Sequence, residues 1–320
     1  MSGPTRWQAE DQRQAMLNYL IRRLLLVFVV IAGVMTIVFV LQRFAGDPTL
    51  LLLPSDASAE ARRTLRHQLG LDRPLLVQYA TYLLDVVRGD LGLSWKFNEP
   101  ALGVVLQALP ATLELTFSAL AFGLLFAVPL GIVAAVRRNS WADTLATAVA
   151  TIGQSMPVYW LGLLLILAFS ARLRWLPAMG SQSVTGLVLP VATLGLDSMA
   201  RITRITRSAM LDVLRQDYIR TVRAMGVKER VVLFKHALRN AAIPIVSLVG
   251  LQLGGLLGGA VIIETVFSYP GVGRIAVQAV YSRDFPVVQA AVLVVAVAFS
   301  AVNMVVDVLC AAISPLIRLR

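Results

Sequence analysis

Six stretches of this chain, each 19 to 28 residues long, contain no aspartate, glutamate, lysine or arginine. A helix needs roughly 20 apolar residues to cross the hydrocarbon core of a bilayer. The whole chain is 58% hydrophobic with a mean hydropathy of +0.75, whereas soluble domains are about 45–50% apolar. The sequence therefore predicts an all-α integral membrane protein with six transmembrane helices, at 24–42, 115–136, 144–171, 175–196, 240–263 and 285–306.

The fourth stretch carries the weakest signal, because Pro177, Pro190 and the turn-like Gly-Ser-Gln-Ser at 180–183 indicate a late helix start. The pattern divides the chain into four parts. They are an N-terminal extension (1–19), a first transmembrane helix (20–42), an extracytoplasmic segment (43–110) and a five-helix transmembrane core (111–320) with a cytoplasmic loop at 201–241.

Basic residues predict the orientation of these helices. If the N-terminus is cytoplasmic, the cytoplasmic segments hold 18 Lys and Arg, and the two short outer loops hold 4. Lys and Arg in short loops favour the cytoplasmic side, so both termini are predicted to be cytoplasmic. The 43–110 segment is too long for this rule, and its 7 basic and 7 acidic residues balance. The bias explains most of the net charge of +11 without nucleic acid, and contact with anionic lipid remains compatible with it.

The loop at 201–241 contains a predicted amphipathic helix over 211–226. Gly226 is a typical helix C-terminus, and a second helix is predicted over 228–239, before Pro244. Such an amphipathic helix either inserts into a groove on a soluble partner or lies on the lipid surface, and the residues alone leave both open. Its apolar residues recur at steps of three or four, as on one helix face: Leu211, Leu214, Tyr218, Val222 and Met225.

The same loop carries a recognisable pattern. Residues 217–226 read Asp-Tyr-Ile-Arg-Thr-Val-Arg-Ala-Met-Gly, and 236–240 read His-Ala-Leu-Arg-Asn, followed by Pro244. This resembles the signature loop of ABC-importer permeases, and the peptide-transport branch in particular. The general signature has Glu-Ala-Ala where this chain has Arg220, Thr221 and Val222. The peptide branch usually has Arg-Thr-Ala there, so Val222 departs from it.

Other segments resemble the same family, at 18–23, 46–48, 68–74, 89–94 and 264–273, so the resemblance covers about residues 16–320. Many members end near Asp-Pro-Arg, whereas residues 314–318 of this chain read Ser-Pro-Leu-Ile-Arg. That ending is closer to the glutathione-importer branch. Substrates of related permeases include dipeptides, longer peptides, glutathione and nickel complexes, and the sequence does not distinguish among them.

The resemblance implies a type I ABC-importer permease fold in the bacterial inner membrane. The implied partners are a second related permease subunit, two ATP-binding subunits and an extracytoplasmic substrate-binding protein, within the lipid bilayer. No cofactor is expected in this chain, because ATP and Mg would be bound by the partner ATPase. In the family this loop holds the coupling helix, which docks into the ATPase subunit. The residues of this chain that match it are Leu214, Asp217, Tyr218, Arg220, Thr221, Arg223, Ala224 and Gly226.

Two further groups of residues are candidates for transport roles. Gly250, Gly254 and Gly258 recur every four residues, and small residues at this spacing let helices approach closely. This face either meets the partner permease or lines the translocation path, or it packs within the chain. Gln154 and Gln252, polar residues within spans, either line the path or bond between helices. The long outer segment is a candidate for the outer gate and for contact with the binding protein. The same roles are predicted for a second group of residues, Phe267, Tyr269, Pro270 and Gly271.

An enzyme and a stand-alone carrier are the rival functions. The chain has no His-Glu-x-x-His or Gly-x-Ser-x-Gly motif, and its only histidines, His67 and His236, are too distant to build a metal site. It has no Gly-x-x-x-x-Gly-Lys-Ser/Thr loop for ATP. No predicted span has an ionisable residue near its centre, as a proton-coupled carrier usually requires. A non-catalytic permease subunit is therefore expected, with a secondary carrier or channel as the alternative.

Overall fold

The computed structural model of the protein describes residues 6–44, 49, 53, 57–180 and 183–313, with side chains described between 21 and 306. Every regular element in these ranges is a helix. The chain divides into two compact units. The first unit is Met1–Leu109 with Ile275–Ser300, and the second is Pro110–Arg274 with Ala301–Arg320. Two motifs singled out in the sequence, at 46–48 and 314–318, lie outside the described residues.

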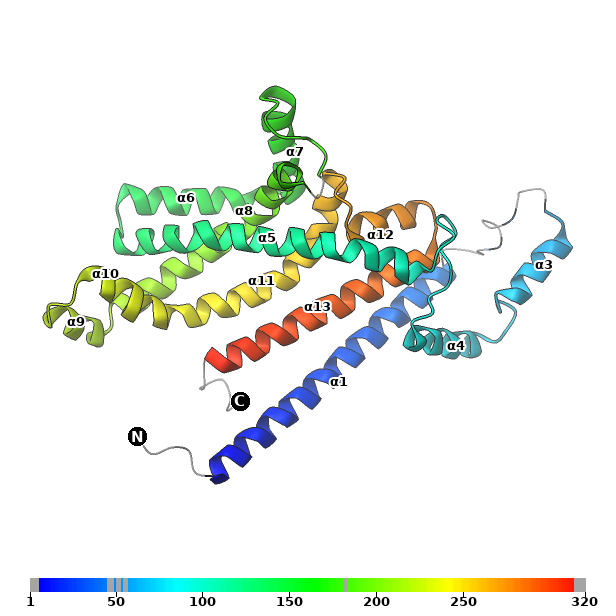
Figure 1. Ribbon diagram of the computed structural model, residues 1–320, viewed down its shortest axis with the longest axis horizontal. Coiled ribbons are helices and arrows are strands. Elements are labelled where there is room, and N and C mark those ends of the chain that lie inside the picture. The colour runs from blue at the N-terminus through cyan, green and yellow to red at the C-terminus, as the bar shows by residue number, and fades with distance from the viewer. Residues whose placement is uncertain (1–5, 45–48, 50–52, 54–56, 181–182, 314–320) are drawn as a thin grey trace. The chain divides into compact units, whose positions relative to one another are not determined.

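The first unit contains α1 (Arg6–Phe44), α3 (Ala59–Gln68) and α4 (Leu75–Arg88), shown in blue and cyan in Figure 1. The start of α5 (Ala101–Val136), most of α12 (Val272–Tyr281) and the first half of α13 (Phe285–Ile313) also belong to it. Helix α13 contacts α1 through a hydrogen bond from Gln289 Nε2 to Gln42 Oε1, 2.5 Å long.

The loop after α4 is attached to the turn before α13. Gly89 and Gly92 have φ of +75° and +81°, a region that glycine enters without strain. Beyond them, the Ser94 hydroxyl donates to Asp284 Oδ2 over 2.5 Å, and the Lys96 N–H donates to the same oxygen over 3.2 Å. Asp284 is buried. The 43–110 segment and the turn before α13 are therefore joined by the buried carboxylate of Asp284, which lies 190 residues away from Ser94 in the sequence.

The second unit contains the hydrophobic core. After α5 come α6 (Trp141–Ser155), α7 (Val158–Leu165) and a π-helical segment, η1 (Ile166–Arg172). The long α8 (Val184–Leu214) contacts α6, α7 and α11 (Leu238–Val266). Between α8 and α11 lie α9 (Asp217–Ala224), α10 (Glu229–Val231) and the π-helical η2 (Val232–Ala237).

Helices α5 and α8 approach each other closely. Small buried residues recur every four positions along α5, and a Cβ added at Gly123 would lie 3.3 Å from the Gly195 carbonyl oxygen of α8. A Cβ added at Gly195 would lie 2.8 Å from the Ala119 carbonyl oxygen. Backbone therefore meets backbone along this interface, as is typical of membrane helices with small residues at such spacing. The α5 residues are Ala119, Gly123, Ala127, Gly131 and Ala135.

Four helical segments in the described part of the chain are long and apolar enough to cross a membrane, and a bent pair makes a possible fifth. The four are Ile21–Phe44, Ala101–Val136, Glu229–Val266 and Phe285–Val306. They contain the first, second, fifth and sixth predicted spans. Helix α8, which contains part of the fourth predicted span, is not among them. This helix begins at Val184, after the Ser183 hydroxyl accepts a hydrogen bond from the Gly186 N–H, so the predicted late start is confirmed.

The third predicted span, 144–171, is not one straight helix. It is divided into Trp141–Ser155 and Val158–Arg172, which are bent by 104°, and Figure 1 shows α7 leaving the direction of α6. Met156 is extended, with φ −96° and ψ 132°, because the ring of the following Pro157 disfavours helical geometry at the residue before it. A late helix start was predicted from proline only in the fourth span, and the helix break before Pro157 was not predicted.

Candidate functional site

The predicted amphipathic helix at 211–226 is broken in the structure. Helix α8 ends at Leu214, Gln216 is extended at φ −73° and ψ 148°, and α9 begins at Asp217. Four residues of the predicted stripe, Leu211, Leu214, Tyr218 and Val222, pack against the core, and two residues differ from the prediction. Ile219, outside the predicted stripe, is fully buried, and Met225, inside it, is 75% exposed. The predicted C-terminus at Gly226 is confirmed by its φ of +74°.

The predicted second helix at 228–239 is helical but not separate. It begins at Glu229 and continues through α10, η2 and α11 as one apolar segment to Val266. Pro244 lies inside α11. Helix α9 therefore packs directly against the beginning of a membrane-length helix.

Core packing and hydrogen bonds hold α9 in place. Ile219 packs in the same core cluster as Val232 and Ala237 of η2. The Tyr218 hydroxyl accepts a hydrogen bond from Asn240 Nδ2 over 2.6 Å and donates to the His236 carbonyl over 3.3 Å. These contacts attach one side of the short helix to η2 and to the start of α11.

An ion pair closes the turn between α9 and α10. Arg223 donates from Nε and a terminal nitrogen to the two carboxylate oxygens of Glu229, over 3.1 and 2.6 Å. This bidentate geometry raises the pKa of Arg223. Gly226 lies within the turn, and a Cβ added there would meet nothing within 4 Å.

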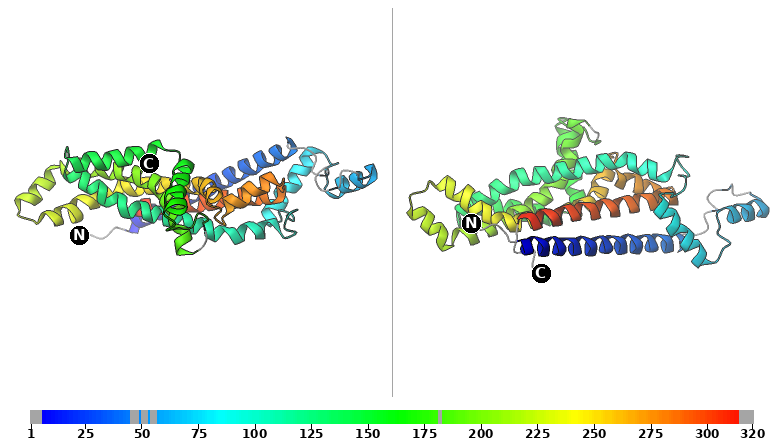
Figure 2. Two further views of the ribbon diagram at one scale, coloured as in Figure 1. Left: turned by 90° about the horizontal axis from the view of Figure 1, so that it is seen from above. Right: turned by 60° about the horizontal axis from the view of Figure 1, so that its bottom comes forward.

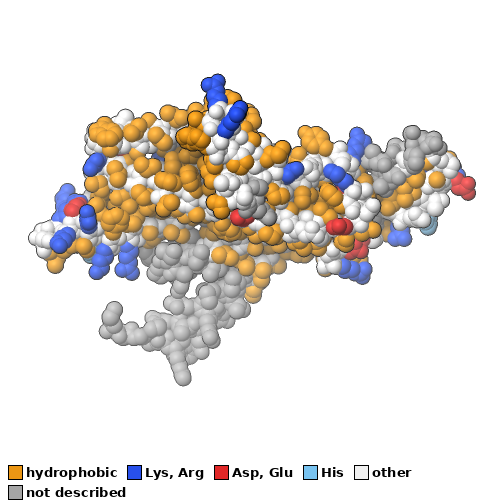
Figure 3. Space-filling view, turned by 45° about the horizontal axis from the view of Figure 1, so that its top comes forward, with side chains coloured by type: hydrophobic (Ala, Val, Ile, Leu, Met, Phe, Trp, Pro, Cys, Tyr) orange, Lys and Arg blue, Asp and Glu red, His pale blue; other side chains and the backbone are white. Residues whose placement is uncertain are grey.

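The outward side of this region is polar and basic. Leu214, Tyr218 and Val222 pack on the chain's own core, so few apolar side chains of α9 remain uncovered. Figure 3 shows Lys and Arg gathered at the end where Figure 1 places α9 and α10. The predicted coupling residues that are exposed are Asp217, Arg220, Thr221, Arg223, Ala224 and Gly226.

The predicted pore and interface residues are not equivalent. Gln154 accepts a hydrogen bond from Arg204 of α8, and Gln252 is almost fully buried. Gly250 faces Val306 of α13, whose side chain a Cβ would overlap, and Gly254 is buried. Gly258 is exposed, with nothing within 4 Å of an added Cβ. Intrachain packing therefore accounts for Gly250, whereas Gly258 belongs to an open face of α11 with Leu251, Gly255 and Ile262.

The predicted outer gate residues form a compact turn. Phe267 and Tyr269 are fully buried, Gly271 is buried, and only Pro270 is exposed. Ser268 between them has φ +52°. The Tyr269 hydroxyl donates to Glu114 over 3.0 Å, and burial raises the pKa of this phenol. Pro270 is thus the one member of this group that a soluble partner could touch directly in this conformation.

Glu264, which directly follows the fifth predicted span, organises this turn, and no role was predicted for it. Its side chain is fully buried. Oε1 accepts from the Thr112 hydroxyl over 2.6 Å, and Oε2 accepts from the Arg274 N–H over 3.1 Å. The Thr112 oxygen also accepts the Val272 N–H over 2.9 Å. A Cβ on Gly271 would overlap this carboxyl group, which explains the glycine there.

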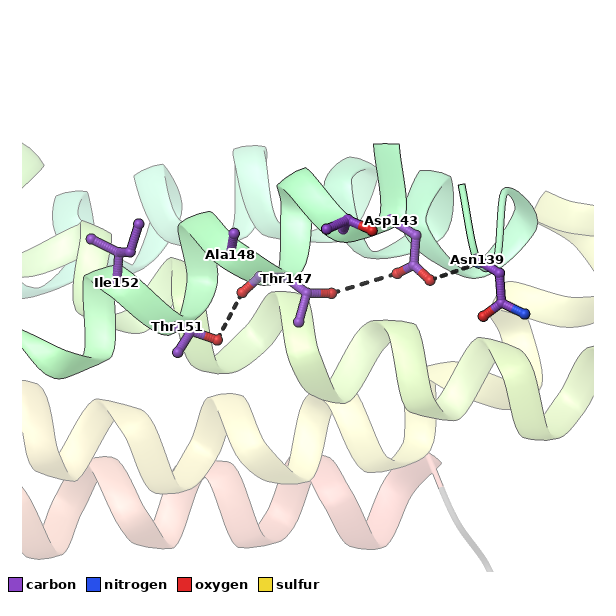
Figure 4. Close-up of a pocket in the computed structure, with 7 residues that line it drawn as sticks. Asn139, Asp143, Thr147, Ala148, Thr151 and Ile152 are labelled. Atoms are coloured by element: carbon purple, nitrogen blue, oxygen red, sulfur yellow. Dashed lines mark hydrogen bonds between the residues drawn. The ribbon is translucent and has the colours of Figure 1, made fainter. Parts of the chain in front are cut away.

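A second buried acid was also missed. Asp143, at the start of α6, accepts two hydrogen bonds from Arg207 of α8, over 2.5 and 2.7 Å. Its Oδ2 also accepts the Asn139 N–H over 3.0 Å. Figure 4 shows the Asn139, Thr147 and Asp143 group beside a shallow pocket on α6. The residues Ser140-Trp-Ala-Asp143 fit a capping-box spacing, which is the sequence signal that was available.

Replacing Asp143 with alanine is expected to destabilise the protein by about 3 kcal/mol, because removing one member of a buried ion pair leaves the other without its partner. Thermal unfolding of the detergent-solubilised protein measures this change. Asp217→Ala is the matched control, since Asp217 is 95% exposed and its pair with Arg220 is 3.6 Å long. An equal loss of stability in both variants would show that the ion pair between Asp143 and Arg207 stabilises the protein no more than an exposed pair does.

Residues 127–319 match the family described as binding-protein-dependent transport system inner membrane component, and residues 16–116 match the corresponding N-terminal family. It is 44% identical over 306 residues to the glutathione transport system permease protein GsiC of Escherichia coli O6:H1, covering 95% of this chain and 100% of the relative. It is 42% identical to the dipeptide transport system permease protein DppB of Alkalihalophilus pseudofirmus over 332 residues, with the same coverage.

Solved structures support the fold. An inward-facing MetNI methionine ABC transporter structure matches with a TM-score of 0.59 and 21% identity, over 68% of this chain and 99% of that chain. The family matches and relatives together cover nearly all of the sequence. The chain therefore belongs to the family of inner-membrane permease components of binding-protein-dependent transport systems.

Proposed function

We propose that this protein is one of two pore-forming permease subunits of an ATP-driven importer of di- or oligopeptides or glutathione. The proposed substrates come from the relatives, a glutathione permease and a dipeptide permease. A second related permease, two ATP-binding subunits that hold ATP and Mg, and an extracytoplasmic binding protein complete the assembly. A panel of dipeptides, longer peptides, glutathione and nickel chelates, assayed for stimulated ATP hydrolysis, tests the substrate class.

The proposed topology has six crossings and both termini in the cytoplasm of a bacterium. The crossings are α1, α5, the bent pair of α6 with α7 and η1, α8, α11 and α13. In this topology 43–110 is the outer segment, and 111–320 is the five-helix core with its cytoplasmic loop at 201–241. Residues 1–19 precede the first crossing.

The single observation that carries the mechanism is the position of α9. This eight-residue helix is held by Ile219 and Tyr218 to the beginning of α11, and it follows α8 after one extended residue. A force applied to α9 therefore acts on two proposed crossings. Its apolar side chains are used inside the chain, so little remains to enter lipid, which favours a soluble ATPase as its partner.

ATP would drive transport by shifting the population of two conformations. Closure of the ATPase pair would move the two docked α9 helices together and favour the outward-open state. The exposed glycine face of α11, at Gly255 and Gly258, is proposed to meet the partner permease or the path. Pro270 is proposed as a contact of the binding protein.

Replacing Gly226 with valine is expected to uncouple ATP hydrolysis from uptake. A β-branched residue at φ +74° is strained by about 1–2 kcal/mol, and the turn next to Arg223 and Glu229 would change. Because nothing lies within 4 Å of the added Cβ, the rest of the fold should persist. Uptake and ATP hydrolysis are measured together in vesicles with the assembled complex. Gly33→Val is the control, since Gly33 is equally uncrowded and lies within helix α1.

Uptake by the Gly226→Val complex at the normal ratio to ATP hydrolysis would refute the coupling role of this turn. Cysteines at Thr221, Ala224 and Met225 should also crosslink to the ATPase subunit. A stand-alone carrier or channel is the alternative, and it requires transport by this chain reconstituted without ATPases. Such transport would replace the importer proposal.

A further inference from the structure

Helix α4 in the outer segment has two sides of different character. Leu76, Ala80, Leu84 and Val87 follow one another at helical spacing, and all four are exposed. Leu76 is 83% exposed and Val87 is 81% exposed. A second side, roughly a third of a turn away, is polar, with Gln78, Thr81, Asp85 and Arg88 at the same kind of spacing. The helix has no buried residue.

A third side of α4 contacts helix α1. The rings of Tyr79 and Tyr82 lie 5.3 and 5.4 Å from the ring of Phe39. The Tyr79 hydroxyl is 2.6 Å from the Thr36 hydroxyl. The contacted residues lie in the last two to three turns of the apolar segment Ile21–Phe44. Helix α4 is therefore held at one end of a membrane-length helix.

Two views show that α4 crosses α1 and does not continue along it (Figures 1 and 2). A helix that crosses the end of a transmembrane helix lies near the boundary between hydrocarbon and headgroups. Tyrosine is enriched at this depth, because its ring is apolar and its hydroxyl is polar. The two tyrosines of α4 thus fit the depth that the contact with α1 defines.

Helix α1 is itself the least buried of the four apolar segments. At the end near α4 its exposed side chains include Ile37, Leu41 and Phe44. The exposed apolar side of α4 therefore lies at the same end of α1 as these exposed apolar side chains. If α1 crosses the membrane, its exposed apolar residues at this end lie against lipid, and α4 lies at the same depth.

We propose that α4 lies flat in the interfacial layer of the bilayer, with Leu76, Ala80, Leu84 and Val87 against the acyl chains. Thr81, Asp85 and Arg88 would face water, and Gln78 donates hydrogen bonds to the Leu71 and Arg73 carbonyls before the helix. The helix contains one acidic and one basic residue, Asp85 and Arg88, so apolar burial and not attraction to anionic lipid drives the contact. This inference requires that α1 crosses the membrane, but it does not depend on the ATPase, the substrate or the direction of α1.

Spin labels on single cysteines test this arrangement in the full-length protein. The one native cysteine, Cys310, is replaced by serine. Labels are placed at Leu76, Leu84 and Val87, and at Thr81 and Arg88 as matched positions on the polar face. The assembled transporter is reconstituted in phosphatidylcholine vesicles without nucleotide. Collision with oxygen and with a water-soluble nickel chelate then gives the depth of each label.

The apolar-face labels are expected about 5–10 Å below the lipid phosphates, and the polar-face labels at or above them. Adding anionic phosphatidylglycerol should leave these depths unchanged. Two results would overturn the proposal. Labels at Leu76 and Leu84 that collide freely with the nickel chelate would mean that this face is in water. Labels there that are shielded from both reagents would mean that a protein, such as the binding protein or the second permease, covers it.

The depths of the labels do not depend on whether ATP hydrolysis is coupled to uptake. A transporter whose uptake does not respond to ATP but whose labels show the expected depths would refute only the proposed function. Correct coupling with the wrong depths would refute only this inference. Leu84→Asp provides a second measurement, because a charge on the apolar face should shift the Leu76 label toward water, whereas Thr81→Asp should not.

Discussion

Alanine at Gly271 is expected to destabilise the protein by about 3 kcal/mol, through the loss of hydrogen bonds to a buried carboxyl group. The three atoms nearest to an added Cβ all belong to the Glu264 carboxyl, and the Cβ would overlap them. That group cannot move freely, because Thr112 and the Arg274 N–H hold its two oxygens. Displacing it leaves a buried polar group without its donors, which costs more than the added methyl gains.

A double-mutant cycle identifies this cause. Glu264→Ala removes the carboxyl group, so Gly271→Ala should cost little in that background, and the two effects should not add. Thermal unfolding of the four detergent-solubilised variants gives the coupling energy. Gly33→Ala serves as the control, since an added Cβ there meets nothing within 4 Å. If Gly271→Ala destabilised both backgrounds equally, the contact with Glu264 would not be the cause.

The transmembrane helices were predictable where one stretch forms one helix. Four charge-free stretches lie in segments that are apolar enough to cross a membrane, because the cost of unsatisfied backbone groups in hydrocarbon requires a continuous helix. The bend of 104° between α6 and α7 was not predicted. Composition does not reveal it, but Pro157 restricts the backbone of Met156, and that signal was present in the sequence.

The loop at 201–241 shows why helical periodicity alone was insufficient. Apolar residues from Leu211 to Met225 repeat at helical spacing with no glycine or proline between them, so one helix was predicted. The extended Gln216 interrupts the helix, so α9 is rotated relative to a continuous helix from Leu211. Ile219 is buried and Met225 is exposed. Ile219 packs with Val232 and Ala237 of η2, and such packing partners are not visible in local sequence.

The buried acids illustrate the same limit. Asp143 and Glu264 were visible as acidic residues near the ends of predicted spans, but their partners were not. Thr112 is 152 residues away from Glu264, and Arg207 is 64 residues away from Asp143. The roles of such residues depend on which helices meet. A single sequence does not contain that information directly.

The interface between α5 and α8 should be intolerant of added volume at Gly131. An added Cβ would lie 2.6 Å from Thr206 Cβ and 2.9 Å from the Thr203 carbonyl oxygen. The second of these atoms is backbone, so rotation of a side chain cannot relieve the overlap, and α5 must move away from α8. Gly131→Val is therefore expected to cost about 3 kcal/mol or more, at the upper end of the range for overpacking.

The effect would extend along the interface, because the small residues of α5 repeat every four positions and close approach at one position requires it at its neighbours. The yield of folded protein and its unfolding temperature are the measurements, with Gly33→Val as the matched control in an uncrowded helix. Normal stability of Gly131→Val would mean that α5 and α8 do not approach as described. Since α8 leads to α9 after one extended residue, a separated α5 would also be decoupled from any movement that begins at α9.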